Sequence, residues 1–394
     1  MKKSLLSILL FCLILALAGF QAADTGTIAL SEGIPENSAP GEASVSPDPD
    51  ITPGGTEADS GQTAGDARNG KTIDPDAAAV SIDDSDFTVR EFIEHAVYLR
   101  YRYLESYAQQ AETFISYGIP LDSLNIRYGE LLGENGKPEF TEEVLDHLVY
   151  TEILEIEGRA AGFSPSESDT DAEARDMLGI SADDDIQQQI AERYRGDVSP
   201  AFITKIAAAR LTEKYLFGQA LQGRSFEEEM VDLRHIVVES EAAANEILEK
   251  LRNGEAWDDL AAAYSLDTYT RDSSGSLGWV RAGEITEELA EAAFSMAPGT
   301  ISDPIRTPFG FHILYLQGKE MRPLEGEALQ EARQDFYEEW GNSLPEKHRI
   351  LSYPSVCEDA LPDEPEFVPV TDDPEAGMLF PAFPSEIPDD PVPE

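Results

Sequence analysis

Cysteine is almost absent from this chain of 394 residues, which contains two. Cys12 lies in an apolar run near the amino terminus, and Cys357 lies near the other end of the chain. Thiol-based zinc sites and redox motifs need several closely spaced cysteines, so both are excluded. If the amino-terminal run is removed as a signal, Cys357 is left alone. We therefore expect a fold that is stabilised by core burial without a disulfide.

Positive charge is also scarce, with 28 Lys and Arg against 77 Asp and Glu, a net charge of −49 at pH 7. Such a surface repels nucleic acid and anionic lipid headgroups, so we expect no nucleic-acid partner. It attracts cationic polypeptides weakly, over about one Debye length. A salt-rich habitat is an alternative explanation of the acidity.

Long apolar runs are missing except for one, from Leu5 to Phe20, which follows two lysines. The run is shorter than the ~20 residues that comfortably span a bilayer. Small residues surround its end, as at a signal-peptidase site. We predict a signal peptide at residues 1–23 and an exported protein, which is periplasmic, extracellular or associated with the cell envelope. An uncleaved anchor, and membrane association through this segment alone, stays open.

Aromatic residues are missing from residues 24–83, which are rich in Ser, Pro, Gly, Asp and Ala. Such a composition cannot bury enough apolar surface to offset chain entropy, so we predict a disordered linker. Residues 358–394 repeat the pattern with more proline and without positive charge. This part is predicted to be a disordered, acidic tail.

Between these segments, apolar residues recur at helical spacing over residues 84–227. A further helical pattern at about 325–340 carries several aromatic residues, which need a partner surface. We expect this helix to pack against the earlier ones. The chain should therefore leave an all-helical domain at 84–227, form a second domain, and complete the first with residues 321–357.

The intervening segment contains two short apolar strands, at 233–238 and 310–316, each with one histidine. Side chains alternate between the two faces of a strand, so His235 shares a face with Leu233, and His312 shares one with Leu314. If the strands pair, the two imidazoles could meet in the core or at its edge. The segment has no HExxH, GxSxG or phosphate-binding glycine motif. A catalytic triad using Ser265 lacks a recognisable nucleophile elbow and oxyanion donors.

Several blocks of the segment then point to one family. They are Arg234–Val238, Ala242–Leu251, Gly254–Ala261, Tyr264–Asp267, Gly275–Trp279, Gly283–Ile285, Glu291–Phe294, Pro298–Ile305 and Thr307–Ile313. In order and spacing they resemble a parvulin-type peptidyl-prolyl isomerase domain over residues 228–320. The whole layout is similar to the exported foldases of the SurA and PrsA type. The resemblance implies an α+β domain, with a small, mostly antiparallel sheet flanked by helices, inserted in an all-α chaperone-like domain.

The resemblance also implies site residues. His235, Asp267 and His312 match the catalytic group of the family, in which both histidines exchange hydrogen bonds with the acidic or thiol residue. Five positions match the apolar floor and rim that hold the proline ring: Leu277, Ile285, Leu289, Phe294 and, at the rim, Phe309. Leu289 stands where the family usually has phenylalanine. Glu239 and Glu241 stand where phosphate-directed members have basic residues, so phosphorylated substrates are disfavoured.

The implied activity is non-covalent. The domain would twist the X-Pro amide in an apolar pocket, with no metal and no cofactor, in unfolded or partly folded exported polypeptides that contain X-Pro bonds. The alternative is a chaperone that holds unfolded polypeptides and whose parvulin domain is weakly active or inactive. Leu289 favours the alternative, and the complete set of His235, Asp267 and His312 favours the isomerase.

Overall fold

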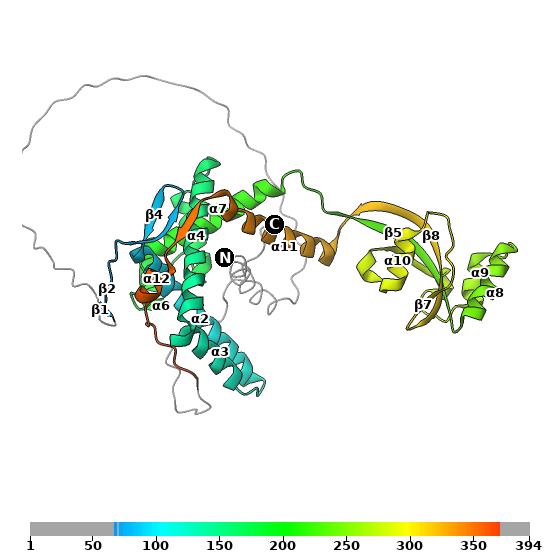
Figure 1. The fold of residues 1–394 in the computed structure, drawn as a ribbon, viewed down its shortest axis with the longest axis horizontal. Helices are drawn as coiled ribbons and strands as arrows, with labels where there is room; N and C mark the ends of the chain where they lie inside the picture. The colour runs from blue at the N-terminus through cyan, green and yellow to red at the C-terminus, as the bar shows by residue number, and fades with distance from the viewer. Residues whose placement is uncertain (1–66, 69–70, 371–394) are drawn as a thin grey trace, which may run out of the picture. The chain divides into compact units, whose positions relative to one another are not determined.

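The computed structural model of the chain describes residues 67–68 and 71–370. They divide into two compact units, one up to Gln219 and again from Trp340, and the other from Ala220 to Glu339. We call them the helical unit and the sheet unit (Figure 1). The predicted signal peptide, most of the linker and residues 371–394 of the tail lie outside the described residues.

Helices make up most of the helical unit. They are α2 (Val89–Ser116), α3 (Asp122–Leu132), α4 (Lys137–Ala160), α5 (Glu167–Leu178), α6 (Ile186–Arg193), α7 (Pro200–Leu221) and α12 (Pro354–Ala360). The start of α2 is set locally, because Thr88 and Glu91 form a reciprocal capping box. The Glu91 N–H donates to Thr88 Oγ1 at 3.4 Å, and the Thr88 N–H donates to Glu91 Oε2 at 2.7 Å.

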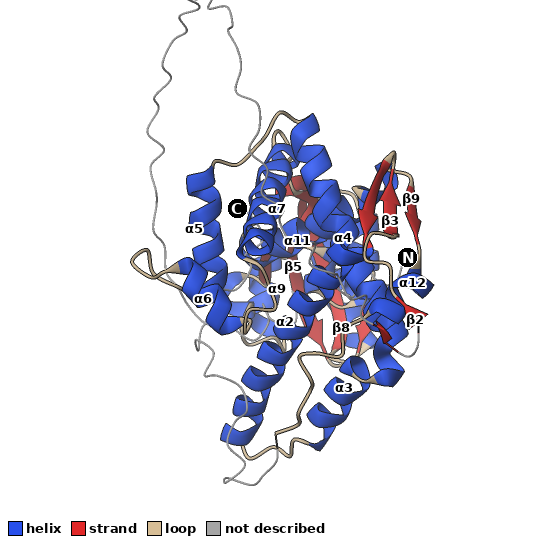
Figure 2. Ribbon diagram, turned by 90° about the vertical axis from the view of Figure 1, so that its left-hand side faces the viewer, coloured by secondary structure: helices blue, strands red, loops and turns tan. Residues whose placement is uncertain are grey.

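The helical unit also contains a small sheet that the sequence did not predict. Strands β3 (Ala78–Ile82), β4 (Ser85–Thr88) and β9 (Ile350–Ser352) pair antiparallel in the order β4-β3-β9. Figure 2 shows β3 and β9 beside α4 and α12, and these elements are in contact. Val80 and Ile82 are fully buried. The helical unit therefore starts before residue 84. Strand β3 has no aromatic residues, and its partner β9, far along the chain, stabilises it.

The boundary of the predicted tail is also corrected by the structure. Residues 358–370 were assigned to a disordered tail, yet Leu361 is buried in the core and Phe367 packs against it. Composition misled here because proline-rich segments, although they lack ladder hydrogen bonds, can still lie along a folded surface in an extended form. A hairpin of β1 (Ala67–Arg68) and β2 (Lys71–Thr72) completes the described chain.

Helix α11 (Gly326–Ser343) corresponds to the aromatic-rich pattern at 325–340. Its aromatic residues divide between two partners. Trp340 packs on Phe217 of α7, with ring centroids 5.2 Å apart, as expected for a helix that returns to the helical unit. Phe336 instead packs on Phe226 at 6.1 Å, and both of these residues belong to the sheet unit.

The sheet unit is built on a four-stranded antiparallel sheet with the order β6-β5-β8-β7. The strands are β5 (Glu227–Val238), β6 (Ser276–Val280), β7 (Ile305–Thr307) and β8 (Gly310–Pro323). Helices α8 (Glu241–Arg252) and α9 (Trp257–Tyr264) cover one face, and α10 (Glu287–Ser295) covers the other (Figure 1). The predicted α+β class with a small antiparallel sheet is confirmed.

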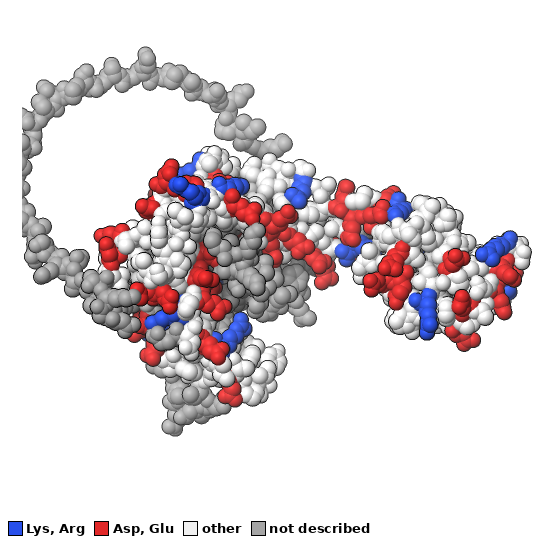
Figure 3. Space-filling model, in the orientation of Figure 1, with Lys and Arg blue, Asp and Glu red and all other residues white. Residues whose placement is uncertain are grey.

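The two central strands are apolar on both faces because each face has its own helical cover. Ile236, Val238 and Ile313 pack with α8 and α9. Leu233 and Leu314 pack with α10 on the opposite face. Among the charged side chains on the visible surface, acidic ones predominate (Figure 3). Among the described residues, no helix combines the length and apolarity that crossing a membrane requires.

Candidate active site

The two histidines that the sequence singled out lie on neighbouring strands and on the same face of the sheet. β5 and β8 pair so that Val237 lies opposite His312 and Leu314 lies opposite His235. This register places the imidazoles diagonally, with ring centroids 5.5 Å apart and ring planes at 42°. Both rings are buried, at 8% exposure for His235 and 5% for His312. The expected meeting of the two imidazoles is confirmed.

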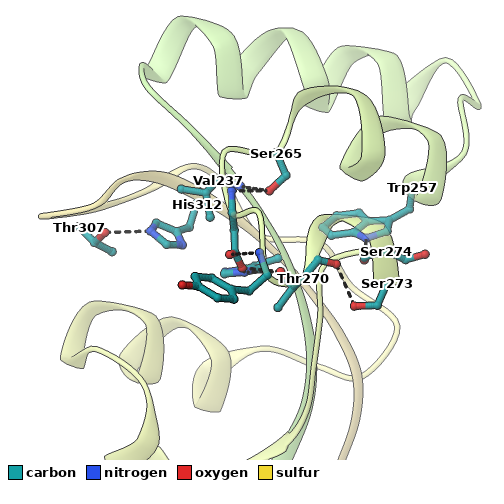
Figure 4. A network of polar contacts seen from close by, with 11 residues as sticks. Val237, Trp257, Ser265, Thr270, Ser273, Ser274, Thr307 and His312 are labelled. Carbon is teal, nitrogen blue, oxygen red and sulfur yellow. Dashed lines mark hydrogen bonds and ion pairs between the residues drawn. The ribbon is translucent and has the colours of Figure 1, made fainter.

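Asp267 lies in the loop that follows α9, and Ser265 attaches this loop to the end of β5. The Val237 N–H and the Asp267 N–H both donate to Ser265 Oγ, each at 3.3 Å, and Figure 4 shows the first contact. The Leu266 N–H donates to the Val237 carbonyl at 2.8 Å. These bonds fix the loop beside the strand that carries His235. Ser265 is therefore a buried structural acceptor in this site.

His235 is joined to Asp267 directly and to Thr270 as well. His235 Nε2 lies 2.8 Å from Asp267 Oδ2 and 3.1 Å from Thr270 Oγ1. The Thr270 hydroxyl donates to the same carboxylate oxygen at 2.5 Å, and the Tyr269 N–H donates to Oδ1 at 3.0 Å. Since a carboxylate accepts, His235 carries its proton on Nε2. Its Nδ1 is buried and has no hydrogen-bond partner among the described residues.

These hydrogen bonds determine the charge of Asp267. Burial by itself raises the pKa of Asp267, but the bonds from Thr270, His235 and the Tyr269 N–H outweigh it, so the pKa lies below its ordinary value. The site therefore holds an ionised carboxylate at neutral pH. That carboxylate is 19% exposed, so a ligand can reach it.

His312 has a different partner. Its Nε2 lies 2.9 Å from Thr307 Oγ1 (Figure 4). The same hydroxyl oxygen accepts the Phe309 N–H at 3.1 Å. Burial, and then the neighbouring His235, lower the pKa of His312 to about 4. His312 is therefore neutral at pH 7. No hydrogen bond joins it to Asp267 within the described residues, so the implied exchange of hydrogen bonds with the acid holds for His235 and not for His312.

The predicted floor residues gather on the same face as the histidines. Leu277 of β6, Ile285 after the turn at 282–284, and Phe294 of α10 are partly buried and pack against one apolar cluster. Leu289 belongs to the interior of that cluster and is 5% exposed. Phe309 lies in the turn between β7 and β8, outside the cluster, and is 75% exposed.

Two further residues of the site, Thr270 and Thr307, are not among the predicted ones. Each hydroxyl lies within hydrogen-bond distance of one histidine; Thr270 belongs to the loop after α9, and Thr307 is the last residue of β7. A weak signal was available, because Thr270 stands three residues after Asp267 and Thr307 directly precedes a Pro-Phe-Gly turn. The spacing in the sequence does not indicate which histidine each threonine hydroxyl contacts.

The arrangement combines an ionised carboxylate, two buried imidazoles, of which that of His312 is neutral, and an adjoining apolar surface. The hydroxyl of Ser265 is engaged by two backbone N–H groups, and Thr270 donates to a carboxylate, so neither is activated as a nucleophile. No group of three His, Cys, Asp or Glu side chains in the described part of the chain is arranged to hold a metal ion. The geometry suits binding of an apolar ring next to a polar group.

Comparison with known proteins agrees with this geometry. Residues 235–318 match the model of the PPIC-type PPIASE domain. The foldase protein PrsA of Caldanaerobacter subterraneus subsp. tengcongensis is 29% identical over 221 residues, which cover 54% of this chain and 71% of that protein. The foldase protein PrsA of Oceanobacillus iheyensis is 30% identical over 197 residues, which cover 48% of this chain and 61% of that protein.

Solved structures include a similar domain. The crystal structure of a PpiC-type peptidyl-prolyl cis-trans isomerase domain is 33% identical to this chain. The match covers 23% of this chain and 92% of that one, with a TM-score of 0.23. The similarity to the PrsA proteins extends beyond residues 235–318, since it covers about half of this chain.

Proposed function

Residues 235–318 form a parvulin-type peptidyl-prolyl cis-trans isomerase domain, and from this premise we propose that the chain speeds X-Pro isomerisation in exported polypeptides while they fold. The observation that carries the proposal is the contact of His235 with the ionised Asp267 beside the apolar cluster of α10. The partners are polypeptides in general, and X-Pro bonds in unfolded or partly folded chains are the specific target.

Isomerisation requires no bond to be cut. Rotation about the X-Pro bond crosses roughly 18 to 20 kcal/mol because it interrupts amide resonance, and uncatalysed exchange takes roughly tens to hundreds of seconds. An enzyme accelerates it by binding the twisted amide more tightly than the planar one. The protein therefore has to hold the proline ring and to favour the charge distribution of the twisted state.

The partly buried residues supply the grip in this proposal. Leu277, Ile285 and Phe294 retain exposed surface and contact the proline ring, and Leu289 supports them from the interior. Phe309, exposed in the turn between β7 and β8, contacts the neighbouring substrate residue. Removing water from the ring strengthens each polar interaction nearby.

Asp267 favours the twisted amide by destabilising the planar one. Resonance places partial negative charge on the carbonyl oxygen of a planar amide, and twisting returns that electron density to nitrogen. A carboxylate near the oxygen therefore raises the energy of the planar state more than that of the twisted state. In this proposal His235 and Thr270 orient Asp267, and the neutral His312 keeps the adjoining space filled without adding a positive charge.

Substrate preference and location follow from charge and from the amino-terminal segment. The exposed Glu239 and Glu241 after β5 disfavour phosphorylated substrates. The apolar run at 5–20 directs the chain out of the cytoplasm, and an uncleaved run would associate it with the membrane.

An exchange assay on an Ala-Pro test peptide checks the proposal. Asp267→Ala and His312→Ala should each lower kcat/KM about 10- to 100-fold, since each changes the polarity beside the amide. Asp272→Ala is the control. The Asp272 side chain lies in the same loop region and is 83% exposed, so its removal should leave the rate unchanged.

Folding of each variant is verified first by its circular dichroism and its thermal unfolding. Folded Asp267→Ala and His312→Ala proteins with the parent rate would refute the proposed site. If the parent suppresses aggregation of an unfolded protein without isomerising the peptide, the chain is instead a holdase with an inactive parvulin domain.

A further inference from the structure

A segment of the chain lies across the helical unit in the manner of a bound peptide. Residues 363–370 follow α12 and have neither helical nor strand structure. We call them the strap; in Figure 1 the strap follows α12 and is the last coloured part of the chain. The residues that contact the strap come from three helices. They are Arg100 and Tyr107 of α2, Asn125, Tyr128 and Gly129 of α3, and Lys137 of α4.

At one end, the strap is held through its backbone by a buried arginine. Arg100 Nη2 donates to the carbonyl of Asp363 at 2.9 Å and to that of Pro365 at 3.1 Å. Arg100 Nε also donates to the Pro365 carbonyl at 3.3 Å, and Nη1 donates to the carbonyl of Leu132 in α3. Arg100 is 4% exposed, so most of its donors serve the strap in place of water.

At the other end, the strap is again held through its backbone. The Val370 N–H donates to the Tyr107 hydroxyl at 2.6 Å, and Asn125 Nδ2 donates to the Val370 carbonyl at 3.2 Å. The Tyr107 hydroxyl donates in turn to Asn125 Oδ1 at 2.6 Å. These donors and acceptors recognise an extended main chain and do not depend on the side chains of the segment, as in other modes of peptide recognition.

Between the two ends, one aromatic ring anchors the strap. Phe367 packs edge-on against Tyr107, with centroids 4.9 Å apart, and nearly parallel to Tyr128 at 6.3 Å. The ring also lies over the backbone of Gly129, where a Cβ would be at an ordinary van der Waals distance of 3.6 Å from it. Paired aromatic contacts of this kind add to the energy of area burial. The surface therefore selects an extended segment with an aromatic residue at one position.

Charge complements these contacts. The strap presents three exposed acidic side chains, Asp363, Glu364 and Glu366. Lys137 Nζ lies 3.1 Å from Asp363 Oδ1, and Arg100 is the second cation beside the strap. In a chain with 28 basic residues against 77 acidic ones, this surface is suited to an acidic or neutral ligand.

We infer that the helical unit has a second polypeptide-binding surface, formed by Arg100, Tyr107, Asn125, Tyr128 and Gly129, and that the strap occupies it as an intramolecular ligand. The competing partner is an extended, aromatic-containing segment of an unfolded polypeptide. This inference deepens the proposed folding function, on which its biological meaning rests, but the binding itself does not depend on isomerase activity.

Release of the strap is physically feasible. The strap is held by a small number of hydrogen bonds and one ring, without pairing in a sheet. Arg100 regains water when the strap leaves, which offsets part of the lost hydrogen bonding. A tethered segment competes at an effective concentration of about millimolar, so the intact chain should bind outside peptides weakly. Weakening the strap should strengthen their binding.

A fluorescence anisotropy titration with a labelled peptide of sequence LPDEPEFVPV, residues 361–370, tests the inference on full-length proteins. Phe367→Ala removes the anchoring ring of the strap and should bind the peptide at least about tenfold more tightly than the parent. Glu366→Ala alters an exposed residue of the same strap and should bind like the parent. A peptide with alanine in place of the phenylalanine should bind the Phe367→Ala protein at least about tenfold less tightly.

Hydrogen exchange on the parent protein provides a test that needs no variant. The amide of Val370 should exchange faster when the peptide is added in excess, while amides in the middle of α4 stay unchanged. Equal peptide affinity of parent and Phe367→Ala, loss of folding in Phe367→Ala, or a Val370 amide unaffected by the peptide would each show that the strap is a fixed part of the core.

The isomerase assay on the same samples separates this inference from the proposed function. Phe367→Ala should isomerise the Ala-Pro peptide at the parent rate, because the strap belongs to the helical unit. Peptide binding without isomerisation by any of the proteins would refute the proposed enzyme and leave the second binding surface intact. Isomerisation with equal peptide affinity of parent and Phe367→Ala would refute the second binding surface and leave the proposed enzyme intact.

Discussion

His235 and His312 are chemically alike, and their surroundings make them different. Both lie on one face of the sheet and both are buried, but His235 contacts a carboxylate and His312 contacts a threonine hydroxyl. Burial, and then the neighbouring His235, lower the pKa of His312 and keep its imidazole neutral. The difference assigns them different parts in the proposed site, since His235 positions Asp267 and His312 remains an uncharged partner.

The lowered pKa of His312 predicts a pH dependence of stability. Its pKa is about 4 in the folded protein and about 6.5 in the unfolded chain. Between these values the unfolded state binds the proton and the folded state does not, so the free energy of unfolding falls as the pH decreases from about 6.5 to 4. The loss should be roughly 3 kcal/mol at most. Urea unfolding at pH 7 and pH 4.5 measures it.

The comparison variant is His312→Gln, which cannot titrate. His95 and His147 in the helical unit also have lowered pKa values and contribute with the same sign, whereas Glu143, whose pKa burial raises to about 7, contributes with the opposite sign. The difference in pH dependence between parent and variant therefore reports His312. The lowered pKa of Asp267 acts only below about pH 4, outside this window. An identical pH dependence in parent and variant would contradict the prediction.

At the scale of secondary structure, one glycine couples β6 and the Asp267 loop to β5. Gly275 has φ +70°, a region that L-residues rarely adopt. Its N–H donates to the Thr270 carbonyl at 2.8 Å, and its carbonyl accepts the His235 N–H at 2.8 Å. The backbone of the glycine therefore links the loop that holds Asp267 to the strand that holds His235. Any side chain at this position has to displace one of them.

Gly275→Ala should therefore destabilise the sheet unit strongly. A Cβ at Gly275 would lie 2.0 Å from the His235 carbonyl oxygen, a distance that requires the strands to separate. Gly278, with φ +69° and open space around it, is the matched control. Gly278→Ala should cost about 1 kcal/mol for the backbone alone, and Gly275→Ala at least about 3 kcal/mol. Chemical denaturation measures both, and equal costs would contradict the steric explanation.

For the whole molecule, the acidity has a thermodynamic consequence. A net charge of −49 makes like charges repel more strongly in the compact state than in the extended one. Several buried ion pairs, such as Glu105 with Arg193 at 2.7 Å, are protected from screening by salt. Added salt should therefore weaken mainly the repulsion at the surface.

We predict that the protein becomes more stable as ionic strength rises from 0.01 M to 0.1 M. The Debye length shortens from about 30 Å to about 10 Å over this range, so the surface repulsion is screened. Unfolding midpoints should rise by about 2 to 4 °C, which corresponds to about 1 kcal/mol. Differential scanning calorimetry in sodium chloride and in potassium chloride checks this. A fall in the midpoints, or opposite effects of the two salts, would contradict the explanation.

Much of the sheet unit could be predicted because its signals are local. The alternation of apolar residues around His235 and His312 predicted two strands, which pair centrally in the sheet. The partner of His312 could not be predicted, because Thr307 lies on a different strand and nothing in the spacing distinguishes it from Asp267 as a partner. The roles of the site residues in catalysis stay predictions.

The sequence alone determined the helical character of residues 84–227, the two histidine-bearing strands and the family of the domain, since periodicity and motif order depend on neighbouring residues. Tertiary structure decided what distant segments do together. It placed β9 beside β3. It also placed residues 363–370, for which composition predicts disorder, against Arg100 and Tyr107. The physical reason is that such segments contain too few apolar residues to signal burial, and become ordered only because buried donors elsewhere in the chain satisfy their backbone.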